Sequence, residues 1–287
     1  MLPKMSERFR AFSFVDRITQ CSRQTIEGEY TVPAAVDRFP ASLMAEAVGQ
    51  LAAWAAMANC QFAVRPVAGL AGSTLFHRTA APGQTLHLSA TLERCDEEAV
   101  AYRGQALIDG QIALQLTDCV GPMLPMEDFD APDAVRADYE RLRTTGVAPG
   151  RFGGVPLPQI DALEHAAGER LRARLVVPER SAAPYFDDHF PRRPVFPGTL
   201  LLDALSALAV RVAREAMAVS ASVELAPRRV SDVKIRSFTA PGSALELAVE
   251  RIDSDSEGVR LKVVARSDGR VSASAGIEVG RPGSLDS

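Results

Sequence analysis

The sequence predicts an α+β protein made of two similar halves, in each of which an antiparallel sheet wraps a long apolar helix. Three observations lead to this fold class: an internal repeat, alternating apolar residues in both halves, and two helix candidates that are apolar on nearly all sides. The 287 residues provide enough chain for two units of ordinary domain size.

The repeat becomes visible when corresponding segments are aligned. Residues 79–88 (TAAPGQTLHL) align with residues 238–247 (FTAPGSALEL). Upstream, a Phe-Pro pair at 39–40 and another at 190–191 each precede one of the apolar helix candidates. The period is about half the chain, which indicates a duplication and not a solenoid.

Strand candidates in both halves show apolar residues at every second position, which is typical of a half-buried strand. The pairs Asp109-Gly110 and Asp268-Gly269 lie between such runs and predict tight hairpin turns. The alternating residues are Leu86, Leu88, Ala90 and Leu92 in the first half, and Val259, Leu261 and Val263 in the second.

The two helix candidates, residues 43–57 and 199–210, have almost no polar face. A helix of this kind must be covered on most sides by other structure, and a sheet curved around each helix provides that cover. Two such units can pair their sheets edge to edge, which also protects the edge strands.

We expect the chain to divide into a first unit at residues 1–121, a linker at 122–153 and a second unit at 154–287. Six prolines punctuate residues 121–158, and residues 133–143 form a short polar helix candidate. This composition favours a tether across the surface of a fused dimer over a separate module.

Composition excludes several function classes. A net charge of −4 and a pI near 5.7 argue against nucleic acid as the main partner. The four cysteines have no metal-ligand spacing and are expected to be reduced and buried, and we expect no metal. The first ten residues lack the apolar core of a signal peptide, and the longest apolar run is too short to span a bilayer. We therefore expect a cytoplasmic protein without a membrane partner.

The most informative segment for chemistry is the loop from His189 to Gly198 (HFPRRPVFPG). Its three prolines stiffen the chain that carries His189. Gly198 follows at the expected first turn of the second apolar helix. Free N–H groups there, together with the helix dipole, can bind a carbonyl oxygen that gains negative charge.

This loop, with an acid fourteen residues after His189, resembles that of the 3-hydroxyacyl-acyl-carrier-protein dehydratases of fatty-acid synthesis. Residues 14–18 (FVDRI) are similar to the family's opening strand, and Glu46-Ala-Val-Gly-Gln50 resembles its helix with an acid and a glutamine four residues apart. The resemblance covers both halves but not the linker or the termini. It implies a double hot-dog fold, with two units paired as a pseudo-dimer.

In that family the histidine of one unit faces the helix acid of its partner. The resemblance therefore implies that His189 is the base and that Glu46, protonated in apolar surroundings, gives its proton to the departing 3-hydroxyl. Gln50, one turn further along the same helix face, would orient Glu46. No cofactor is implied, because the thioester already acidifies the carbon. The residues implied to bind the substrate and its developing oxyanion are Gly198, Thr199, Val195 and Phe190.

The reciprocal site is expected to be degenerate. It would pair Asp203 with the first half's counterpart of His189, which is Arg38. Ala41 stands where Gly198 would be, and the intervening loop is missing from the first half. We expect an Asp203–Arg38 ion pair that seals this second site.

The residues leave other functions open. A hot-dog thioesterase would use Glu46 or Asp203 to activate water, although hydrolysis does not explain the His189 loop. A non-catalytic acyl-binding scaffold is a third reading, because fold alone does not fix function. An aspartate at 203 resembles a dehydratase subtype that also isomerises. The thioester carrier can be acyl carrier protein or coenzyme A, and the fused pair can form a further homodimer.

Overall fold

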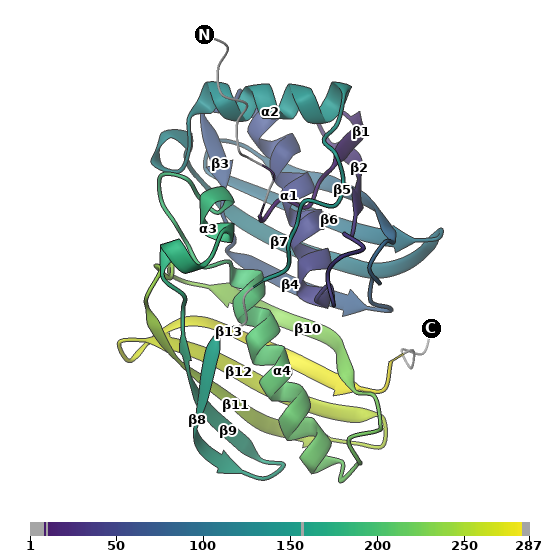
Figure 1. Ribbon diagram of the computed structural model, residues 1–287, viewed down its shortest axis with the longest axis vertical. Helices are drawn as coiled ribbons and strands as arrows, with labels where there is room; N and C mark the ends of the chain where they lie inside the picture. The colour runs from purple at the N-terminus through teal and green to yellow at the C-terminus, as the bar shows by residue number, and fades with distance from the viewer. Residues whose placement is uncertain (1–8, 10, 156–157, 283–287) are drawn as a thin grey trace.

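The computed structural model describes residues 9, 11–155 and 158–282, which form two units (Figure 1). Each unit has a hairpin, a long helix and four further strands in that order, and the first unit has one additional short strand after its helix. The first unit contains β1 (Arg17–Cys21), β2 (Thr25–Thr31), α1 (Ala41–Asn59), β3 (Val64–Pro66), β4 (Leu70–Phe76), β5 (Thr85–Cys95), β6 (Ala99–Ile108) and β7 (Gln111–Pro125). The second unit contains β8 (Gln159–Ala166), β9 (Arg170–Val176), α4 (Gly198–Ala216), β10 (Ala226–Ile235), β11 (Ala244–Ser254), β12 (Gly258–Ser267) and β13 (Arg270–Gly280). Between the units lie η1 (Met126–Asp128) and α2 (Pro132–Thr144), and the loop before α4 contains η2 (Arg180–Ala182) and α3 (Tyr185–Asp188).

The two units share one sheet, which is continuous across their boundary (Figure 1). Within the described residues its order is β1-β2-β5-β6-β7-β4-β10-β13-β12-β11-β9-β8, with β3 beside β7. The central pair, β4 and β10, is antiparallel, with Thr74 opposite Val230. Each unit therefore has no free edge where it meets the other, as the sequence predicted. Each helix is preceded by a hairpin, β1–β2 before α1 and β8–β9 before α4.

The two long helices are equivalent in position. Each has 19 residues and begins directly after a proline, Pro40 for α1 and Pro197 for α4. Helix α1 packs on β2, β5 and β6, helix α4 packs on β11, β12 and β13, and the two helices contact each other. Glu46 and Asp203 are each the sixth residue of their helix. The two acids therefore occupy corresponding places in the two units.

The predicted strands and turns are confirmed. The alternating apolar side chains of β5 and β12 are buried, with at most 5% of any of them exposed. At the two Asp-Gly pairs, Asp109 and Gly110 have φ values of 52° and 75°, and Asp268 and Gly269 have 50° and 76°. Positive φ at both central residues is the geometry of the two-residue hairpin turn that matches strand twist.

The segment between the units is more closely packed than a tether would be. Strand β7 continues to Pro125, four residues beyond the boundary expected at 121. Helix α2, found where a polar helix was expected, packs against β1 and stacks Tyr139 on Trp54 of α1. Phe152 is only 4% exposed and joins an aromatic cluster of the first unit. The apolar side of α2 and Phe152 account for this packing, because both bury surface against the first unit.

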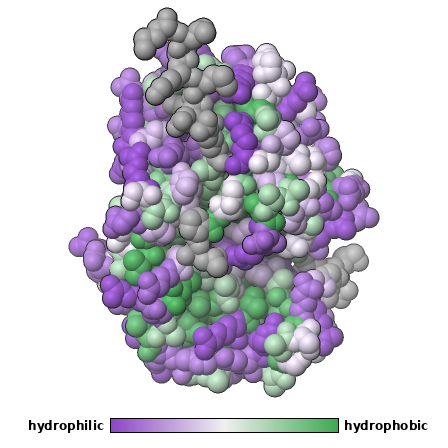
Figure 2. All heavy atoms as spheres, in the orientation of Figure 1, coloured by the Kyte–Doolittle hydropathy of each residue, from purple (hydrophilic) through white to green (hydrophobic). Residues whose placement is uncertain are grey.

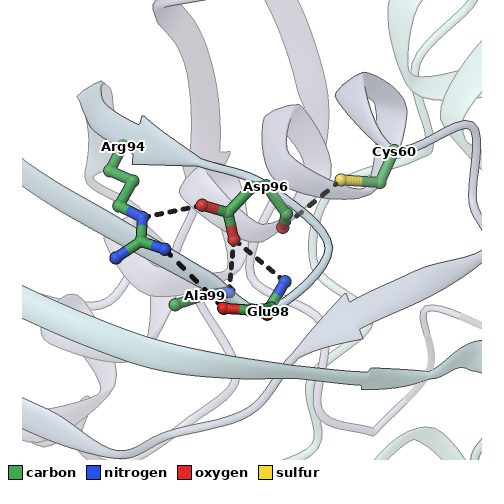
Figure 3. Close-up of polar contacts among 5 residues, drawn as sticks. All are labelled: Cys60, Arg94, Asp96, Glu98 and Ala99. Carbon is green, nitrogen blue, oxygen red and sulfur yellow. Dashed lines mark hydrogen bonds and ion pairs between the residues drawn. The ribbon is translucent and has the colours of Figure 1, made fainter.

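A hairpin turn fixes the C-terminal end of α1 (Figure 3). The Oδ1 atom of Asp96 accepts hydrogen bonds from the N–H groups of Glu98 and Ala99, both at 2.9 Å. The Cys60 thiol, at the helix end, donates to the Asp96 carbonyl oxygen at 3.6 Å. All four cysteines are free, as expected, but only Cys119 is fully buried.

The surface is polar over most of the face shown in Figure 2, with apolar atoms gathered mainly over the second unit. In the part of the chain that the structure describes, no helix has both the length and the hydropathy to cross a membrane.

Candidate active site

A cavity of about 300 Å³ lies where the two units meet, and both contribute to its walls. Helix α1 supplies one wall, and the first turn of α4 and the His189 loop supply another. The apolar part of the α1 wall includes Ala53, Trp54 and Met57. Glu46 and His189, from different units, line the same space.

His189 is held by the loop around it. It caps the C-terminus of α3, where its N–H donates to the Tyr185 carbonyl at 2.9 Å. Its ring Nδ1 lies 2.8 Å from the carbonyl oxygen of Val195, and the Val195 N–H donates back to the His189 carbonyl at 2.9 Å. A carbonyl oxygen can only accept, so Nδ1 carries a proton and Nε2 is the basic nitrogen.

The surroundings of His189 favour the neutral imidazole. Burial lowers its pKa below the usual 6.5, and the nearby Arg65 guanidinium acts in the same direction. The Glu46 carboxylate and the Val195 carbonyl act in the opposite direction without cancelling the effect of burial. A neutral imidazole near pH 7 can accept a proton from a substrate.

Glu46 receives one hydrogen bond on each carboxylate oxygen. Gln50 donates from Nε2 to Oε1 at 2.9 Å, and the Thr199 hydroxyl donates to Oε2 at 2.8 Å. Gln50, which was expected to orient Glu46, is in hydrogen-bond contact with it. Thr199 was expected at the oxyanion, but its hydroxyl contacts the acid, because the first turn of α4 lies directly opposite Glu46. Both oxygens of Glu46 are therefore held by a donor, one from its own helix and one from the other unit.

The first turn of α4 borders the cavity through Gly198 and Thr199. N–H groups at this end of a helix have no partner within the helix. A Cβ built on Gly198 would meet only side-chain atoms of Ile235, at 3.5 Å or more, which is ordinary contact. Packing therefore does not require a glycine here, and its missing side chain leaves cavity space open beside the N–H groups.

Phe190 and Val195, expected among the residues that bind the substrate and its oxyanion, both line the cavity. The Phe190 ring stacks on His189 with centroids 4.1 Å apart, and its side chain is 7% exposed. The Arg65 guanidinium lies 3.9 Å from the centroid of the Phe190 ring. Val195 holds the imidazole through its backbone. Both residues therefore shape the base and its surroundings.

The reciprocal position contains an ion pair. Arg38 donates from Nη2 to Oδ2 of Asp203 at 3.0 Å, with the side chains 59% and 24% exposed. Burial raises the pKa of Asp203, and Arg38 opposes that shift. Neither residue lines the cavity that holds His189 and Glu46.

Sequence reasoning missed three residues around His189: Asp188, Phe12 and Arg65. Asp188 accepts hydrogen bonds from the N-terminal segment, and the Phe12 ring lies edge-on to the His189 ring, with centroids 5.4 Å apart. No pattern singled out Phe12 or Arg65, because both reach His189 only through the pairing of the two units. For Asp188, the adjacent Asp187-Asp188 pair gave no sign of which carboxylate faces inward. Among the described residues, no group of His, Cys, Asp and Glu is arranged to hold a metal ion.

The fold and the position of this cavity between units define a double hot-dog protein. Solved structures match it over nearly their whole length. A tesB protein of Mycobacterium avium subsp. paratuberculosis has a TM-score of 0.59 at 14% identity, covering 92% of this chain and 95% of that one. A conserved protein of unknown function with hot-dog fold, from Alicyclobacillus acidocaldarius, has a TM-score of 0.55 at 11% identity, covering 94% and 97%. These likenesses concern the fold.

Sequence comparison identifies the family. Residues 164–275 match the ApeI-like family of ApeI dehydratases. The 3-hydroxyacyl-acyl-carrier-protein dehydratase FabZ of Novosphingobium aromaticivorans is 32% identical over 126 residues, which are 43% of this chain and 77% of that protein. The FabZ protein of Anaeromyxobacter sp. (strain K) is 34% identical over 102 residues, which are 32% of this chain and 60% of that protein. The chain belongs to the FabZ dehydratase family.

Proposed function

We propose that this chain is a dehydratase that converts a 3-hydroxyacyl thioester to the trans-2-enoyl thioester. One observation carries the proposal: a histidine whose Nε2 is the basic nitrogen and a glutamate from the other unit line a single, largely apolar cavity. A base and a carboxylic acid on the two sides of a bound substrate are what elimination of water from neighbouring carbons needs. Membership of the FabZ family supports the same reaction.

The reaction follows from the positions of these groups. Nε2 of His189 removes a proton from the carbon next to the thioester carbonyl, and the N–H of Gly198 stabilises the oxygen as it gains charge. Glu46 gives its proton to the 3-hydroxyl as the carbon–oxygen bond breaks, so that water leaves and the double bond forms. Gln50 and Thr199 then hold the Glu46 carboxylate. His189 and Glu46 return to their starting protonation by exchange with solvent.

The apolar wall formed by Ala53, Trp54 and Met57 suits an acyl chain extending away from the reacting carbons. We propose acyl carrier protein as the thioester carrier, since the FabZ relatives are named for it. Coenzyme A is the alternative carrier.

The test is a direct assay of the full chain with 3-hydroxyacyl thioesters of several chain lengths, on acyl carrier protein and on coenzyme A. Mass spectrometry of the product distinguishes three outcomes. Loss of one water from an intact thioester supports the dehydratase. Release of free acid would mean that the chain is a thioesterase and not a dehydratase. Binding without conversion on either carrier makes the chain an acyl-binding protein.

A further inference from the structure

Residues 11–14, here called the N-terminal strap, connect the two units beside the cavity. The strap belongs to the first unit, but its N–H groups bind Asp188 of the second. The N–H groups of Ala11 and Phe12 donate to Oδ2 of Asp188 at 2.9 and 2.8 Å, and the Ser13 hydroxyl lies 3.4 Å from the same oxygen. Asp188 directly precedes His189, so this cluster attaches the strap to the loop that carries the base.

The same strap also fixes the amide of Gln50. The Phe14 N–H donates to Oε1 of Gln50 at 2.8 Å, and Nε2 of Gln50 donates to the Phe12 carbonyl oxygen at 3.0 Å. An N–H group can only donate and a carbonyl oxygen can only accept, so these two contacts determine which way the amide faces. They direct its NH₂ group toward Glu46, where it donates to Oε1. With the amide turned around, an oxygen would face the carboxylate.

A third contact shields the base. The Phe12 side chain is 2% exposed, and its ring meets the His189 ring at an interplanar angle of 75°. Phe12 and Ser13 also form part of the cavity wall. The strap therefore contacts the base directly and the acid through Gln50.

We propose that Asp188 is a positioning residue, which locks the strap against the His189 loop and so holds both reacting side chains in place. This inference rests on the proposed dehydratase function and adds a residue to its machinery. A carboxylate that accepts two backbone N–H groups makes charge-assisted bonds, which are stronger than neutral ones. Asp188 acts across the unit boundary through the strap that it holds.

The first test measures kcat and KM for Asp188→Ala and Asp188→Asn, with Asp187→Ala as the matched control. Asp187 is the neighbouring acid, 74% exposed, and pairs with Arg180 at 3.6 Å at the surface. We expect Asp188→Ala to lower kcat at least tenfold with KM within about twofold, since misplacement affects the chemical step more than binding. Asp188→Asn keeps an acceptor oxygen and should retain intermediate activity. Asp187→Ala should match the wild type.

The second test does not depend on turnover. It follows the titration of the His189 ring by NMR in histidine-labelled protein, with the signal assigned from His189→Gln. The charged groups that act on this ring are Glu46 from α1 and Arg65 from β3, and Asp188 is its neighbour in the chain. Releasing the strap admits water, so the His189 pKa should rise toward 6.5 in Asp188→Ala and stay unchanged in Asp187→Ala. Phe12→Ala should cause the same rise in the His189 pKa, and it replaces Asp188→Ala as the test variant if Asp188→Ala does not fold.

The outcomes separate the two proposals. If the wild type shows no dehydration but the His189 titration shifts in Asp188→Ala, the proposed function fails and the strap's hold on the His189 loop stands. If Asp188→Ala keeps wild-type kcat and an unshifted His189 titration, the positioning role is overturned. A lowered melting temperature of Asp188→Ala would not change this conclusion, because it would show only that Asp188 stabilises the fold.

Discussion

The hydroxyl of Thr199 donates to Oε2 of Glu46 at 2.8 Å, across 153 residues of sequence and across the boundary between the two units. Thr199 is the second residue of α4, and the second residue of α1 is Ser42. Within the described structure, the buried Ser42 hydroxyl has no hydrogen-bond partner. The duplicated helices thus keep this bond at one site and lack it at the other.

Thr199→Val removes the hydroxyl with little change in volume and should lower kcat about tenfold. A hydrogen bond to a charged group contributes about 1.5–3 kcal/mol, and part of that is recovered by water entering the cavity. Steady-state kinetics measures the effect. Ser42→Ala is the matched control and should leave kcat unchanged. Equal losses in the two variants would mean that the Thr199 bond has no special part in the reaction.

Gly198→Ala should leave the fold intact and reduce kcat/KM by at least an order of magnitude. The added methyl meets only Ile235 in ordinary contact, so stability should hold or rise, but it occupies space beside the N–H groups proposed to bind the thioester oxygen. Thermal melting and kinetics on the same sample separate the two effects. Ala41→Gly changes the first residue of α1 and is the control for a substitution at the start of a long helix. Full activity in Gly198→Ala would remove Gly198 from the substrate site.

Much of the fold could be predicted because it repeats. The alternation in β5 and β12, the Asp-Gly turns and the two apolar helices are local patterns, and each appears twice. The family resemblance placed Glu46 and Asp203 at reciprocal positions of the two units, and each is the sixth residue of its helix. It also predicted the Asp203–Arg38 contact, which the structure contains.

The contacts that the sequence did not predict join segments far apart in the chain. Thr199 was expected beside the oxyanion because its backbone is at a helix start, yet its hydroxyl faces Glu46. That direction depends on how α1 and α4 meet once β4 and β10 have paired. Phe12 and Asp188 likewise come together only across this boundary, and no local pattern encodes such a contact.

The depressed pKa of His189 predicts a pH dependence of stability. The folded protein keeps this imidazole neutral, whereas the unfolded chain takes up a proton as the pH falls through about 6.5. The unfolded state then binds more protons, so the contribution of His189 to the free energy of unfolding decreases below that pH. Urea unfolding of wild type and His189→Gln from about pH 8 to about pH 5 measures it. The wild type should lose stability relative to the variant at the acid end, and a gain there would contradict a buried neutral histidine.

Arg38→Met should destabilise the fold more at neutral than at acidic pH. Burial raises the pKa of Asp203, so its ionised form costs stability as the pH rises through that pKa, and Arg38 offsets part of this cost. We expect a loss of about 1 kcal/mol at neutral pH, because Arg38 is more than half exposed and solvent screens the pair. The double variant Arg38→Met/Asp203→Asn should recover most of it. A loss independent of pH would indicate lost packing instead.

The measurement that tests the account most directly compares dehydration rates for two pairs of variants at equivalent positions. His189→Ala and Glu46→Gln change the proposed site, and Arg38→Ala and Asp203→Asn change the reciprocal one. We expect each of the first two to lose at least about a hundredfold in kcat, and each of the second two to stay within about threefold of wild type. Comparable losses in both pairs, or full activity in either His189→Ala or Glu46→Gln, would contradict a single site built from the histidine of one unit and the glutamate of the other.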